Sequence, residues 1–139
     1  MADYDPRYLA GVRLFNEEAF FEAHEVWEGL WLETSGEAKR FYQGLIQAAV
    51  CLLHLSNRNY RGAARLYHSA RQYMQAYGRH YLGLDIEEFW RKMEATCRPY
   101  LESKQPPAEE PAVYPQISLH PEPVSWPAPE TFLPGEEES

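Results

Sequence analysis

With 139 residues, of which 45% are hydrophobic, the chain is long enough for one globular domain with an appendage. Its net charge of -8 argues against a general nucleic-acid-binding protein, and no apolar run approaches the ~18 residues that would cross a membrane. The acidic N-terminus has no apolar signal region, and Cys51 and Cys97 form no CxxC motif, so we expect a cytoplasmic protein without a disulfide framework.

Apolar periodicity predicts five helices, over residues 6–17, 19–33, 37–55, 60–77 and 86–101. Asp5 and Pro6 are typical of a helix start, and Gly36 is typical of a left-handed residue after a helix end. The third helix is almost entirely apolar from Leu45 to Leu53, which indicates a helix buried among its neighbours. We therefore predict an all-α fold, in which antiparallel helix hairpins surround this buried central helix.

The C-terminal segment differs sharply in composition from the helical part. Residues 105–139 hold nine of the eleven prolines, a density that excludes helices and central strands. We predict a helical domain over residues 1–104 and an extended, proline-rich arm over residues 105–139. The arm also carries apolar side chains, so it could dock on the helical domain, dock on a partner or remain a solvated tail.

Charge is segregated along the chain. Residues 1–37 carry nine acids against two bases, for a net charge of -7, whereas residues 38–84 carry seven bases and no acid. We expect the acidic second helix and the basic fourth helix to lie near each other and to offset each other's charge.

The second helix places a histidine within an aromatic stripe. His24 shares this stripe with Phe20, Trp27 and Trp31, and Glu28 lies one turn further on. Glu22 and Glu25 belong to the opposite, solvated stripe. The third helix has one polar stripe, formed by Gln43, Gln47 and His54. If the two helices pack antiparallel, these polar groups meet in the core, either as a buried network that fixes the packing or as a site.

A metal site is one form that such a cluster could take. His24-Glu25-x-x-Glu28 differs from the zinc-protease pattern His-Glu-x-x-His at the second ligand, which is Glu28. A histidine and a glutamate one turn apart can still bind a divalent metal, with His54 as third ligand. The corresponding alternative function is that of a metal-binding or metal-dependent hydrolytic protein. We assign no catalytic residue, because no separate base or nucleophile stands out, and expect no other cofactor.

The fourth helix offers an anion-binding stripe. Arg58, Arg61, Arg65 and His68 follow at helical spacing, with tyrosines nearby. Arginines interleaved with aromatic residues can hold phosphate or single-stranded RNA. No recognised RNA-binding motif surrounds them, so nucleic acid is the weakest of the alternatives.

Several of these residues also form a family pattern. Three segments resemble the signature of domain of unknown function 309. They are Phe15-Asn16, the run from Phe20 to Glu25 with Trp27-Glu28 and Trp31, and the run from Tyr42 to Ala49. His54, Asn59 and Gly62-Ala63 extend the resemblance, which covers roughly residues 7–80. The chain departs from the pattern at Glu18, where the family has glycine in the turn. The resemblance implies a compact all-α domain and no known activity.

These observations favour a non-enzymatic binding or interaction module over an enzyme. We expect a protein partner, which includes a second copy of the chain in a homo-oligomer, and no membrane association. The arm and the Trp- and Tyr-rich surface are the expected contact regions.

Overall fold

The computed structural model describes residues 3–134, and it confirms the all-α class. The five helices are α1 (Pro6–Asn16), α2 (Phe20–Glu33), α3 (Ala38–Ser56), α4 (Tyr60–Gln75) and α5 (Ile86–Leu101). A short hairpin, β1 (His80–Tyr81) and β2 (Leu84–Asp85), joins α4 to α5, and a single 3-10 turn, η1 (Pro129–Phe132), lies in the arm. No helix within residues 3–134 is long and apolar enough to cross a membrane.

The helix ends follow local chemistry. The Asp5 carboxylate accepts a hydrogen bond from the Arg7 backbone N–H at 2.8 Å, and Pro6 is the first residue of α1. Gly36 has a φ of 84°, in the left-handed region that glycine adopts without steric cost. At the other end of the domain, α5 continues through Pro99 to Leu101, and the side chain of Tyr100 in its last turn is buried.

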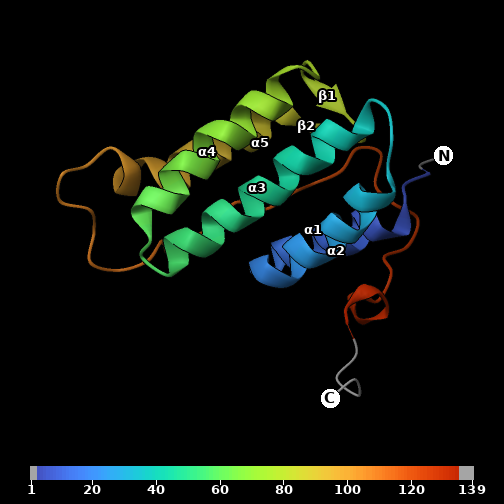
Figure 1. Ribbon diagram of the computed structural model, residues 1–139, viewed down its shortest axis with the longest axis horizontal. Coiled ribbons are helices and arrows are strands. Elements are labelled where there is room, and N and C mark those ends of the chain that lie inside the picture. The colour runs from blue at the N-terminus through green and yellow to red at the C-terminus, as the bar shows by residue number, and fades with distance from the viewer. Residues whose placement is uncertain (1–2, 135–139) are drawn as a thin grey trace.

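The helices form two layers around a central α3. In Figure 1, α3 lies between α4 on one side and α2 on the other, whereas α5 and the arm lie behind it. The ring centroids of Phe15 on α1 and Phe89 on α5 are 5.9 Å apart, which joins the two helices of the rear layer. The layer of α2, α3 and α4 therefore has one side in the core and one side open to solvent.

A close contact between α1 and α2 fixes the position of α2. Trp27 is fully buried, and its indole Nε1–H donates a hydrogen bond to the Tyr8 carbonyl at 3.1 Å. Gly11 provides the space for this ring, because a Cβ at that position would lie 2.0 Å from Trp27 Nε1. The side of α2 that faces outward is set by this contact.

The hairpin was predicted only as a break between helices. His80 pairs with Asp85 and Tyr81 with Leu84, and the turn residues Leu82 and Gly83 have φ values of 46° and 79°. Such a turn needs positive φ at both central residues, which leucine disfavours. The Tyr8 hydroxyl on α1 donates a hydrogen bond to the Leu82 carbonyl at 2.9 Å and helps to hold the turn.

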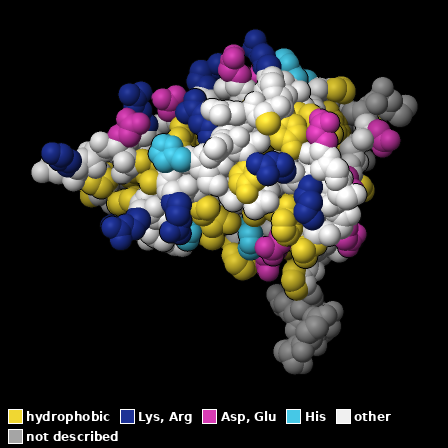
Figure 2. Space-filling model, turned by 45° about the horizontal axis from the view of Figure 1, so that its top comes forward, with side chains coloured by type: hydrophobic (Ala, Val, Ile, Leu, Met, Phe, Trp, Pro, Cys, Tyr) yellow, Lys and Arg dark blue, Asp and Glu magenta, His cyan; other side chains and the backbone are white. Residues whose placement is uncertain are grey.

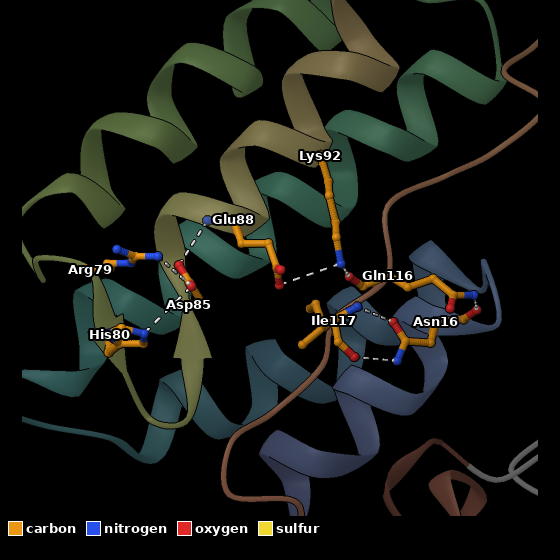
Figure 3. A network of polar contacts seen from close by, with 8 residues as sticks. All are labelled: Asn16, Arg79, His80, Asp85, Glu88, Lys92, Gln116 and Ile117. Atoms are coloured by element: carbon orange, nitrogen blue, oxygen red, sulfur yellow. Dashed lines mark hydrogen bonds and ion pairs between the residues drawn. The ribbon is translucent and has the colours of Figure 1, made fainter.

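The proline-rich arm docks on its own helical domain rather than extending into solvent. Its side chains Tyr114, Ile117 and Leu119 are buried, and Leu119 forms an antiparallel bridge with Leu84 of β2. The Asn16 side chain at the end of α1 forms two hydrogen bonds with the arm backbone at Ile117, as Figure 3 shows. Its Oδ1 accepts from the Ile117 N–H at 2.7 Å, and its Nδ2 donates to the Ile117 carbonyl at 2.9 Å.

Further contacts continue along the arm. Lys92 on α5 donates to the Gln116 carbonyl at 3.2 Å, and the His120 N–H donates to the Gly83 carbonyl at 2.8 Å. The turn η1 then packs on α1. Up to residue 134, the arm thus covers α1, α5 and the hairpin and does not cover the outer side of α2, α3 and α4.

Candidate interaction surface

One stripe of α2 faces solvent although it carries two large apolar side chains. Phe21, Glu25, Glu28 and Leu32 follow at i, i+4, i+7 and i+11 and so share one side of the helix. Phe21 is 48% exposed and Leu32 67% exposed. Single exposed apolar residues are ordinary on protein surfaces, so the significance of this pair depends on what lies beside it.

The neighbouring stripe of α3 is mostly apolar and only half buried. Ile46, Val50 and Leu53 occupy it, together with Gln43 and Gln47. The opposite stripe of α3 fills the core, which accounts for its continuous apolar sequence. The half-buried residues of α3 and the exposed stripe of α2 form one surface.

The outer stripe of α4 is polar and basic. Arg61, Arg65, His68 and Gln72 follow at i, i+4, i+7 and i+11, and all four are exposed. Neither Arg61 nor Arg65 forms an ion pair with any residue between 3 and 134. Arg58, in the turn before α4, is exposed as well and has a φ of 63°. Figure 2 shows hydrophobic side chains at the surface interleaved with Lys and Arg side chains.

We call the combined outer stripes of α2, α3 and α4 the outer face. We expected its opposite charges to offset each other within the chain, but they do not. The acids of α2 and the arginines of α4 lie on opposite sides of α3, and no ion pair joins the two helices in the described part of the chain. The outer face therefore has an acidic edge, an apolar centre and a basic edge.

The predicted buried network around His24 does not form. The side chain of His24 is 22% exposed, its Nδ1 lies 3.2 Å from the Phe21 carbonyl oxygen, and its Nε2 lies 3.9 Å from Glu28 Oε2. Within residues 3–134, no hydrogen bond joins His24 to Gln43 or Gln47. No polar or charged residue of this range is buried in the core. The physical reason is that the polar stripe of α3 points outward, while Trp27 and other apolar side chains fill the core.

The three proposed metal ligands are not brought together. His54 lies at the far end of α3, where its Nδ1 is 3.3 Å from Asn59 Nδ2. Within the described range, no group of three or more His, Cys, Asp or Glu side chains is arranged to hold a metal ion. Only the pair of His24 and Glu28 remains, at the rim of the outer face, and the neighbouring Glu22 and Glu25 are partly exposed.

Two polar features of this region were not predicted from the sequence. Lys39 places its Nζ 4.3 Å from the centroid of the Trp31 ring and donates to the carbonyls of Trp31 and Thr34, at 3.0 and 3.2 Å. A cation at the C-terminal end of α2 is favoured by the helix dipole. The buried Gln47 Oε1 and Trp31 Nε1 have no hydrogen-bond partner among the residues of the described structure.

Two cysteines that are far apart in the sequence meet behind the outer face. Cys51 on α3 and Cys97 on α5 are both free and buried. A hydrogen bond in which the Cys51 thiol donates to Cys97, and then burial, raise the pKa of that thiol, so it stays protonated and unreactive at neutral pH. This pair is a packing contact between the layers and is not accessible from the outer face.

Comparison with known protein families gives a match to part of this chain. Residues 8–66, which run from α1 into α4, match the model of the domain of unknown function DUF309. The matched segment contains the α2 and α3 stripes and the start of the α4 stripe, whereas α5 and the arm lie outside it. The search of curated proteins found no match. The segment from residue 8 to residue 66 is therefore similar to DUF309, a domain of unknown function.

Proposed function

We propose that this protein is a non-enzymatic binding module that contacts a macromolecular partner through the outer face. The observation that carries the proposal is the apolar surface of that face, in which Phe21 and Leu32 are exposed on the α2 edge and Ile46, Val50 and Leu53 are half-buried on α3. Contiguous apolar surface with a polar rim is typical of protein interaction sites. Charged residues at the two edges would add orientation and partner choice.

The position of the arm supports this choice of surface. Its apolar residues Tyr114, Ile117 and Leu119 are buried against the same chain and are unavailable to a partner without undocking. Val113, Val124 and Trp126 remain exposed, but they are spread along the arm instead of forming one stripe. We therefore propose the outer face, rather than the arm, as the region that contacts a partner.

Site-specific photo-crosslinking tests the proposal in the cells that naturally produce the protein. A photo-reactive amino acid at Leu32 should give a crosslinked product of discrete mass. The matched control places the same group at Glu122, which is also exposed but lies in the arm. A discrete product from position 32 and none from position 122 is the expected result, and no product from position 32 would contradict the proposal.

A second candidate is divalent-metal binding, favoured by the 3.9 Å separation of His24 Nε2 and Glu28 Oε2. Two protein ligands bind a metal weakly unless water or a partner completes the shell. Isothermal titration of the purified protein with Zn²⁺ tests it. Heat that disappears in His24→Ala, but not in the exposed control His80→Ala, would support a metal site, and identical curves for both variants would reject it.

Anion or RNA binding by Arg58, Arg61, Arg65 and His68 is the third candidate. Their exposure and the lack of ion pairs at Arg61 and Arg65 favour it. It predicts binding of a single-stranded RNA oligonucleotide that weakens steeply with salt and with the double change Arg61→Ala and Arg65→Ala. Binding that is insensitive to both would eliminate this reading.

A further inference from the structure

We propose that the partner on the outer face presents an amphipathic helix with acidic side chains along one flank of its apolar stripe. The inference rests on the proposed function, since it takes the outer face as the binding surface. It adds the chemical character of the partner and the part of the face on which its acids lie.

The cations between residues 38 and 84 differ in whether the chain itself engages them. This segment carries seven Lys and Arg residues and no acid. Four of the seven have a partner, which is the Trp31 ring for Lys39, the Tyr73 ring for Arg40, the Tyr67 hydroxyl for Arg71 and Asp85 for Arg79. The other three, Arg58, Arg61 and Arg65, form no ion pair and stack on no ring among residues 3–134.

These three arginines lie together at one end of the outer face. Arg58 is in the turn between α3 and α4, Arg61 and Arg65 are near the start of α4, and all three are exposed. A Cβ at Gly62 would lie 3.1 Å from His54 Cδ2, so the start of α4 adjoins the end of α3. We call this group of three arginines the basic end.

The acids of α2 lie beside the opposite end of α3. Lys39 at the start of α3 contacts Trp31 near the end of α2, so the two helices run antiparallel. Glu25 and Glu28 are within about two turns of Trp31 and therefore lie beside the first half of α3. The charge of the basic end is thus not offset by α2, and it is complementary to an acidic partner.

The apolar stripe of α3 gives the partner its second requirement. Arg40 stacks on Tyr73 of α4, so the polar stripe that Arg40 shares with Gln47 and His54 adjoins α4. The apolar stripe lies on the other side of it, next to α2, and consists of the half-buried Ile46, Val50 and Leu53.

This order across the face specifies how a helix would lie on it. A straight apolar stripe along α3 fits the apolar face of a partner helix, as in helix-in-groove recognition. Phe21, at the start of α2, is 48% exposed at the same end of α3 as the basic end and extends the apolar contact. The flank of the partner helix that faces α4 would then lie towards Arg61 and Arg65, where acidic side chains are favoured.

The tyrosines around α4 favour a protein over RNA as the partner. Proteins that bind single-stranded RNA without a base-reading motif stack the bases on exposed aromatic rings. Tyr60 and Tyr67 pack against aromatic rings of α5, and Tyr73 lies beneath the Arg40 guanidinium. All three rings are therefore engaged within the chain, whereas the apolar stripe of α3 is available to a protein.

Selection from a peptide library tests the proposal with the purified full-length chain. Random peptides of about 16 residues, long enough for a helix of about 24 Å, are displayed and selected on wild type and on a reversed variant with Arg61→Glu and Arg65→Glu. The matched control, with Arg91→Glu and Lys104→Glu, changes the net charge equally at exposed positions outside the outer face. Circular dichroism of each variant confirms that it is folded.

We expect wild type and control to enrich acidic peptides with apolar residues at helical spacing, and the reversed variant to lose this enrichment. Fluorescence anisotropy with one enriched peptide should give a Kd at least about tenfold higher for the reversed variant than for the control. Phe21→Ala, which leaves every charge in place, should also weaken binding of this peptide, because it removes part of the apolar contact.

Two peptide results would overturn the proposal, namely enrichment without an acidic bias and an acidic peptide that binds wild type and the reversed variant equally. A single-stranded RNA oligonucleotide that binds more tightly than every selected peptide, and is lost in the reversed variant, would also overturn it.

Mass spectrometry of the product that crosslinks from Leu32 separates this inference from the proposed function. A partner segment without acidic residues would overturn the inference but leave the binding module intact. Absence of any crosslinked product would remove the binding module itself.

Discussion

The contact between Gly11 and Trp27 predicts opposite effects for one substitution at two helical glycines. A Cβ at Gly11 would lie 2.0, 2.3 and 2.4 Å from the Nε1, Cδ1 and Cε2 atoms of Trp27. Ordinary carbon contacts are about 3.5–4.0 Å, so the ring would have to move by at least about 1.5 Å. Trp27 is fully buried and donates a hydrogen bond to Tyr8, so it cannot move without opening the contact between α1 and α2.

These effects set the expected magnitude for Gly11→Ala. Overpacking costs about 1–3 kcal/mol, and a buried indole N–H without its acceptor costs about 1–3 kcal/mol more. Alanine recovers up to about 1 kcal/mol through its higher helix propensity. We therefore expect the free energy of unfolding to fall by about 1–6 kcal/mol.

Gly29→Ala is the matched control on α2. No atom lies within 4 Å of a Cβ at Gly29, so only the helix propensity changes, and the variant should gain up to about 1 kcal/mol. Urea unfolding monitored by circular dichroism compares the two variants with wild type. Equal or higher stability of Gly11→Ala would show that Trp27 does not occupy the space over that glycine.

Three further predictions follow from the structure. Glu18 has a φ of 64°, so Glu18→Gly should stabilise the protein by up to about 1 kcal/mol in urea unfolding. The control Glu17→Gly, at a φ of -89°, should destabilise the protein. A loss of stability in Glu18→Gly would contradict this prediction. Asn16→Ala should increase amide hydrogen exchange at Ile117, because both side-chain hydrogen bonds to that residue are lost, and unchanged exchange would show that the arm is held elsewhere. Burial, and then the charge of Asp5, raise the pKa of Tyr42 from 10.0 to about 12.

The sign of this last effect follows from proton binding. Between pH 10 and about 12 the unfolded chain loses the Tyr42 proton while the folded protein keeps it. The contribution of Tyr42 to stability is therefore complete below pH 10 and is lost as the pH rises towards 12. Ultraviolet titration of phenolate absorbance in wild type and in Tyr42→Phe measures it, and a Tyr42 signal that titrates near pH 10 in the folded protein would refute it.

Local chemistry made much of the helical fold predictable. The start of α1 at Asp5 and Pro6 and the end of α2 at Gly36 depend on neighbours within three residues, so the sequence alone predicts them. Glu18 is instructive in another way. The resemblance led us to expect glycine there, and the structure shows a left-handed φ, which glycine adopts without steric cost.

The parts that could not be predicted depend on contacts between distant residues. The docked arm is held by Asn16 and Ile117, which are 101 positions apart. The hairpin requires a positive φ at Leu82, a residue that gives no local signal for it. The failed network at His24 has a similar cause, since an almost wholly apolar α3 does not reveal which of its stripes faces the core.

Photo-crosslinking from Leu32, whose side chain is 67% exposed on α2, tests the use of the outer face most directly. We predict a product of discrete mass from position 32 and none from Glu122 in the arm. No product from position 32, or the same product from both positions, would contradict a binding module that uses the outer face.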